Sequence, residues 1–142
     1  MFVRWKRHKR RSRKQSEPDG KGGWKWIEEP RFLLSAALVR SERVNGKPRQ
    51  RIVAYLASIR ENLLGETWPR IWFWDSADKA LAGLADNDRQ KCEAALLSRV
   101  RRPTAEEVAA AEEERKKQKQ ALMGEILRCG GDPRRAINLF KN

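Results

Sequence analysis

The sequence predicts an α+β fold, in which a small antiparallel sheet with a β-hairpin precedes three or four helices. Three observations predict it: an Asn-Gly pair between two β-prone runs, a series of helix caps after residue 65, and a glycine-rich stretch behind a basic N-terminal segment. We therefore expect a basic, largely flexible arm over residues 1–23, a β-hairpin module over 24–64 and a helical region over 65–142.

The hairpin has the clearest local signal. Both central residues of a type I′ turn need positive φ, which Asn45 and Gly46 tolerate best. A two-residue loop then places Arg40 opposite Arg51, and alternation gives one apolar face, as in a half-buried antiparallel pair. The other expected pairs are Val44–Lys47, Glu42–Arg49, Val39–Ile52, Leu38–Val53, Ala37–Ala54, Ala36–Tyr55 and Ser35–Leu56. The residues expected to be buried are Leu33, Val39, Ile52, Ala54 and Leu56.

The N-terminal segment combines a β-prone start at 2–6 with a dense basic run. Like charges repel and little apolar surface is available, so we expect the run to be disordered when free. Residues 16–23 have linker composition, and residues 24–27 can form another edge strand.

Capping residues delimit the expected helices. Asp75 or Ser76 can cap a helix that runs to about Leu84, just after the aromatic residues 72–74, and Asp86 can cap one from about 87 to 100. Thr104 with Glu107 is a capping box for a third helix, ended by glycines at 130–131. A short last helix is expected after residue 132.

The charge balance points to a polyanion. Lys and Arg number 32 against 19 Asp and Glu, a formal charge of +13, and the surplus is clustered rather than scattered. Such a surplus repels itself unless an anion is bound, and DNA and RNA are the usual polyanions. No apolar run has the length to span a membrane or to form a signal peptide, so we expect a cytoplasmic protein without a membrane partner.

The hairpin and the arm carry the candidate binding residues. Because like charges opposed across a sheet destabilise it, the Arg40–Arg51 pair suggests an anion between them. The alternative is a solvated face on which arginines deter edge pairing. A two-stranded ribbon also fits the DNA major groove, which is ~12 Å wide. The residues expected to contact nucleic acid are Lys6, Arg7, Lys9, Arg10, Arg11, Arg13, Lys14, Arg40, Arg43, Lys47, Arg49, Arg51 and Tyr55.

Three further features leave alternatives open. Trp24 and Trp26 share a strand face among lysines, and either stack on bases or pack in the fold. The arm either binds nucleic acid or serves as a solubilising tail or targeting signal. Leu122–Phe140 is an apolar cluster that can dock on a protein partner or on a second copy of the chain.

The sequence contains no catalytic or metal-binding pattern. It lacks the phosphate-loop, dinucleotide-binding and zinc-protease motifs. Cys92 and Cys129 stand far apart, and His8 is the one histidine. We expect no enzymatic activity, no cofactor and no metal.

The first 60 residues resemble a known module. A strand such as Phe2-Val3-Arg4, followed by a hairpin containing Arg49-Gln50-Arg51, resembles the N-terminal β module of DDE-type insertion-sequence transposases, although Ala57 stands where those proteins have glycine. The resemblance implies a module that contacts DNA. It does not imply transposition, because the remainder is too short for the nuclease domain and instead resembles short bacterial proteins of mobile elements.

Together these observations predict an accessory protein that binds nucleic acid, most readily duplex DNA, and that is nucleoid-associated in that case. A protein that binds structured RNA or a ribonucleoprotein is the first alternative. A protein-interaction adaptor or inhibitor encoded by a mobile element is the second.

Overall fold

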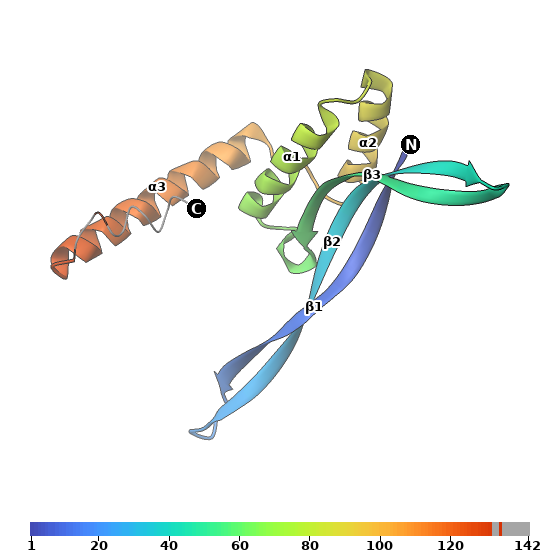
Figure 1. Ribbon diagram of the computed structural model, residues 1–142. Helices are drawn as coiled ribbons and strands as arrows, with labels where there is room; N and C mark the ends of the chain where they lie inside the picture. The colour runs from blue at the N-terminus through green and yellow to red at the C-terminus, as the bar shows by residue number, and fades with distance from the viewer. Residues whose placement is uncertain (132–133, 135–142) are drawn as a thin grey trace. The chain divides into compact units, whose positions relative to one another are not determined.

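Three antiparallel strands form the sheet: β1 (Phe2–Pro18), β2 (Trp24–Val44) and β3 (Lys47–Arg60), with β2 in the centre. In this computed structural model, which describes residues 1–131 and 134, four helical elements follow (Figure 1). They are the short 3₁₀ helix η1 (Glu61–Leu63) and the α-helices α1 (Thr67–Leu81), α2 (Asp86–Leu97) and α3 (Ala105–Arg128). The predicted α+β class is confirmed.

The chain divides into two units, residues 1–103 and 104–142. The first contains the sheet with α1 and α2, and the second begins with α3. The predicted boundaries at residues 23 and 64 differ from this division, because α1 and α2 pack on the sheet and share its core.

The basic N-terminal segment is a strand, so the prediction of a largely flexible arm is wrong. β1 pairs with β2 along its whole length. Val3 and Trp5 pack against the core, and the indole of Trp5 stacks on Phe73 with the ring centroids 6.0 Å apart. Further along, Lys14 lies opposite Glu28 and Glu17 opposite Lys25. Cross-strand pairs of opposite charge stabilise a sheet, whereas the prediction of disorder considered only repulsion within the basic run.

The expected linker at 16–23 is the end of a β-hairpin. A turn at residues 19–23 joins β1 to β2, and Asp19 accepts hydrogen bonds at Oδ1 from the backbone N–H groups of Lys21 (2.8 Å) and Gly23 (2.9 Å). Gly20 and Gly22 adopt φ of 76° and 82°, which glycine adopts without steric cost. Residues 24–27 therefore begin the central strand instead of forming a separate edge strand.

The second hairpin has the predicted turn and the predicted register near it. Asn45 and Gly46 have φ of 52° and 76°, and Arg40 lies opposite Arg51. Past Val39–Ile52 two β-bulges shift the register, so the four pairs expected further back are wrong. The observed pairs there are Leu38–Ala54, Ala37–Tyr55, Ala36–Ala57 and Ser35–Ser58.

The bulges also change which residues are buried. They leave Val53 and Leu56 as extra residues in β3, and Leu56 enters the core. Val39 is fully buried as expected, but Ile52 is 45% exposed and Leu33 is half-buried. Ala54 is partly buried against the core. Helices α1 and α2 cover one face of the sheet, through Leu34, Leu38, Ile59, Phe73, Trp74, Leu81, Cys92 and Leu96.

The N-cap of helix α1 lies nine residues before Asp75, the first of the two expected caps. This N-cap is Glu66, and Pro69 lies in the first turn of the helix, where a missing N–H removes no helical hydrogen bond. Residues 72–74 therefore lie inside the helix, with Phe73 and Trp74 in the core. Helix α2 follows Ala85, so Asp86 is its first residue instead of its cap, and it ends at Leu97.

Helix α3 confirms the predicted capping box. The Thr104 hydroxyl accepts from the Glu107 backbone N–H (3.2 Å), and the Glu107 carboxylate accepts from the Thr104 N–H (3.0 Å). The helix ends at Arg128, before Gly130 at φ 71°. The expected last helix falls on residues outside the described part of the chain, and so do residues 132–133 and 135–140 of the Leu122–Phe140 cluster.

Candidate nucleic-acid interface

Strand β2 is longer than the part of the sheet that has three strands. At about 3.3 Å per residue, its 21 residues reach about 70 Å. β3 ends opposite Leu33 and β1 begins opposite Val39, so β2 has only one neighbour beyond each of these points. A first ribbon (residues 11–30, β1 with β2) and a second ribbon (residues 40–51, β2 with β3) thus extend from opposite ends of β2 (Figure 1).

The second ribbon carries five basic residues and one acidic residue, Glu42. Arg40 faces Arg51 across the strands, while Arg49 faces Glu42. Arg43 and Lys47 lie opposite Pro48 and Val44. All five basic residues are exposed, and within the described part of the chain none of them has an ion-pair partner.

The sheet face opposite α1 and α2, called the open face below, is also basic. Alternation along β1 places Arg4, Lys6 and Arg10 on it, since Val3 and Trp5 face the helices. On β3 it carries Tyr55, which lies in one row with Ala37 and Arg4. Tyr55 is 76% exposed, so its ring is available to a ligand.

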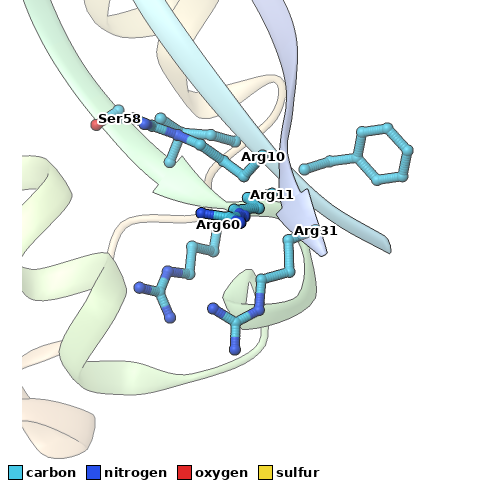
Figure 2. Close-up of a pocket in the computed structure, with 7 residues that line it drawn as sticks. Arg10, Arg11, Arg31, Ser58 and Arg60 are labelled. Carbon is cyan, nitrogen blue, oxygen red and sulfur yellow. The ribbon is translucent and has the colours of Figure 1, made fainter. Parts of the chain in front are cut away.

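Four arginines gather where β3 ends and the sheet narrows to two strands. They line a hollow of about 530 Å³, called the arginine hollow below, together with Ser58, Phe32 and Leu33 (Figure 2). Arg10 and Arg11 come from β1, Arg31 from β2 and Arg60 from β3. No carboxylate lines it, and in the described residues none of the four arginines forms an ion pair.

A β-bulge shapes this hollow. Between Arg10 and Arg13 the register shifts, so that Arg11 and Ser12 face the single residue Pro30. Proline has no N–H to donate to a neighbouring strand, and it is tolerated here because β3 has already ended on its other side. The bulge brings Arg11 to the hollow beside Arg10, although strict alternation would place them on opposite faces.

The other predicted arm residues have different surroundings. Arg7 forms an ion pair with Glu61 (2.7 Å between Nε and Oε2), and its guanidinium lies 3.5 Å from the centroid of the Phe32 ring. It therefore ties β1 to the chain after β3, and its predicted contact with nucleic acid stays a prediction. Lys6 is exposed on the open face and Lys9 is exposed opposite Phe32.

The first ribbon carries the two candidate stacking residues near its turn. Trp24 and Trp26 are 71% and 74% exposed, which excludes the alternative that they pack in the core. Arg13 and Lys14 lie opposite Glu29 and Glu28, so acidic residues accompany the basic residues of this ribbon. Its turn is held by Asp19, whose pKa is lowered by the hydrogen bonds from the backbone of Lys21 and then of Gly23.

Sequence reasoning missed Arg4, Arg31 and Arg60. Arg31 and Arg60 lie far from the basic run, and only the pairing of three strands brings them to Arg10. One available signal was Pro30, because a proline within a strand indicates a bulge or an edge. The bulge could not be assigned without the register set by the turn at 19–23.

Comparison of the chain with models of protein families, with curated proteins and with solved structures gives no match. The resemblance to a transposase β module therefore stays a prediction. Among the described residues no helix is long and apolar enough to cross a membrane. The same residues contain no group of three or more side chains arranged to hold a metal ion. Burial raises the pKa of the Cys92 thiol, with a smaller contribution from Asp88, and so keeps it protonated and unreactive.

Proposed function

We propose that the protein binds nucleic acid, duplex DNA before other forms, through phosphate contacts from the second ribbon and the open face. The observation that carries the proposal is the opposed pair Arg40 and Arg51, which is exposed and has no carboxylate partner in the described chain. Opposed like charges cost stability, and an anion between them removes that cost.

The shape of the second ribbon supports duplex DNA as the target. Two paired strands without a third neighbour can enter the major groove, which is ~12 Å wide. The residues near its turn alternate between its two faces, so Arg49 and Arg51 lie on one face and Arg43 on the other. Such a ribbon presents arginines to phosphates on both sides of a groove. With this function the protein acts in the cytoplasm, at the nucleoid.

A second candidate is a single-stranded or structured RNA. The three exposed aromatic side chains Trp24, Trp26 and Tyr55 support it, since unpaired bases stack on such rings at ~1–3 kcal/mol each. Structured RNA offers unpaired bases in its loops, whereas its major groove is too deep and narrow for a ribbon. Competition between a DNA duplex and an RNA hairpin with matched charge, at one salt concentration, separates the two candidates.

The test of the proposal is a binding titration of the full chain with a DNA duplex. In the variant with Arg40→Ala, Arg49→Ala and Arg51→Ala, three charge-assisted contacts are lost, and we expect affinity to fall by about 100-fold or more. All three side chains are exposed, so circular dichroism and the Tm of the variant should stay close to those of the wild type.

The matched control removes the same charge from the other unit. Lys116, Lys117 and Lys119 are exposed on α3, and their replacement by alanine leaves the same net charge as the ribbon variant. We expect this control to lose less than about fivefold, because the proposed function assigns no phosphate contact to these lysines. Equal losses in both variants would show that net charge, and not the second ribbon, determines binding.

A further inference from the structure

We infer that the arginine hollow is a binding site for a phosphate group that carries two or more negative charges, as at the end of a nucleic-acid strand. This inference rests on the proposed function and assigns one site within that surface. Four arginines from three strands line this one hollow, and its lining contains no acidic residue (Figure 2).

The concentration of charge distinguishes the hollow from the second ribbon. On the ribbon, basic residues follow one another along the strands, as the singly charged phosphates of a backbone do. In the hollow, four arginines from three strands line a single space. A single backbone phosphodiester would neutralise one of them. A terminal phosphate monoester, with a charge of about −2 at neutral pH because its second pKa is ≈ 6, together with the next phosphodiester matches three.

The chemistry of the lining fits the same ligand. Arginine presents a planar fork of N–H donors that bonds phosphate oxygens in pairs. Ser58 contributes a hydroxyl that can donate to a further oxygen, and Leu33 and Phe32 give apolar walls. The volume of about 530 Å³ lies in the range of small-ligand pockets and exceeds that of one phosphate. A terminal nucleotide, with its sugar against the apolar wall, is of suitable size.

The fold keeps these four arginines available. Arg7 stands three residues before Arg10 on β1, and it contacts Glu61 and the Phe32 ring. Glu61 directly follows Arg60 in the chain, and its carboxylate is engaged by Arg7. The one acidic side chain adjacent to Arg60 in the sequence is thus directed to another partner, and the hollow keeps its positive charge.

The experiment compares strands that differ only at their ends. We measure the binding of DNA duplexes of one sequence whose strands have a 5′-phosphate, a 3′-phosphate or only hydroxyl ends. The wild-type chain should bind at least one phosphorylated form about tenfold more tightly than the hydroxyl form. In the variant with Arg31→Gln and Arg60→Gln this ratio should fall to about one. The glutamines keep a polar stem at two positions outside the core.

The matched control removes two charges from the second ribbon, through Arg43→Gln and Arg49→Gln. This variant should bind all three duplexes more weakly but keep the wild-type ratio, because its hollow is intact. Should the hollow variant fail to fold, as judged by circular dichroism, the single variant Arg10→Gln takes its place with the same expected loss of the ratio.

A second arm identifies the source of the phosphate group. Inorganic pyrophosphate and a nucleoside triphosphate are titrated alone against the wild-type chain. Binding at least tenfold weaker than that of the phosphorylated duplex supports a strand end as the ligand. Equal binding would overturn the strand end and leave a free polyphosphate as the ligand of the hollow.

The outcomes for the two proposals are separable. Binding of the hydroxyl duplex without any gain from a terminal phosphate overturns the inference about the hollow and leaves the proposed function intact. In a second outcome no duplex binds, but pyrophosphate binds to the wild-type chain and not to the hollow variant. This result overturns the proposed function and leaves the hollow as an anion site.

Discussion

The two ribbons share strand β2 and both end in turns that contain glycine, but they differ in how many acidic residues accompany their basic residues. The first ribbon has five basic and four acidic residues, and the second has five basic and one acidic residue. In the first, Lys14 faces Glu28 and Glu17 faces Lys25, whereas in the second Arg40 faces Arg51. Three of the five basic residues in the first ribbon, Arg13, Lys14 and Lys25, thus lie opposite an acid, but only Arg49 does so in the second.

This difference shows that the count of basic residues in a segment does not locate a binding surface. The densest basic run of the sequence, residues 6–14, is divided by its strand among several roles. Arg7 is tied to Glu61, Lys14 lies opposite an acid, and Arg10 and Arg11 line the hollow. Cross-strand partners decide which charges are available to a polyanion.

The largest expected contrast comes from removing two charges from each ribbon. Arg49→Gln with Arg51→Gln should weaken binding to a DNA duplex by about 30-fold or more, because the proposed function assigns a phosphate contact to both side chains. Lys14→Gln with Lys25→Gln should weaken it by less than about threefold. Titrations at one salt concentration measure both. Similar losses from the two ribbons would remove the distinction drawn between them.

A smaller effect on binding is expected from the two exposed tryptophans of the first ribbon. Trp24→Ala with Trp26→Ala should weaken binding to a single strand by about tenfold, since each stacked base contributes ~1–3 kcal/mol, and should leave duplex binding almost unchanged. Trp72→Ala is the control, because Trp72 is also exposed but lies on α1. Fluorescence titration with a homopolymer measures the difference. An equal response to the Trp72 variant would argue against stacking on the first ribbon.

The smallest expected effect is a difference between the two turns in how their stability depends on pH. The backbone hydrogen bonds to Asp19 lower the pKa of its carboxyl below the ordinary value of 3.8 in the folded ribbon. The stability that the carboxylate contributes is therefore fully present above that ordinary value, and it is lost as the pH falls through the lowered pKa. The turn at Asn45 and Gly46 contains no ionisable side chain and should not respond.

The NMR shifts of the backbone amides of Lys21 and Gly23 report this transition. They should move cooperatively as the turn loosens at acid pH, while the amide of Gly46 stays in place. In Asp19→Asn the amide oxygen can still accept hydrogen bonds but does not titrate, so the transition should disappear. Its persistence in that variant would assign it to another group.

Local chemistry predicts much of this fold. The Asn45-Gly46 turn fixes the register of the second hairpin as far as Val39–Ile52, and Thr104 with Glu107 fixes the start of α3. Prediction fails at Val53, where a bulge adds one residue that no local signal marks. From that point the pairing depends on which residues the helices bury. Leu56 is buried as expected, but as a bulge residue and not opposite Ser35.

Non-local pairing explains the remaining errors. Residues 2–18 become a strand because β2 pairs with them along their length, apart from one bulge, and the core accepts Val3 and Trp5. Neither condition is visible within the basic run itself. The arginine hollow depends on three strands and the bulge opposite Pro30, so its members Arg31 and Arg60 could not be selected from the sequence.

The most direct test of the account is the salt dependence of duplex binding for the wild-type chain and for the variant with Arg40→Ala, Arg49→Ala and Arg51→Ala. Each phosphate contact contributes about −0.9 to the slope of log K against log salt concentration. The account predicts that the slope of the variant is shallower than that of the wild type by about 2.7 for three lost contacts. Parallel lines for the two proteins would contradict the claim that these arginines contact phosphates.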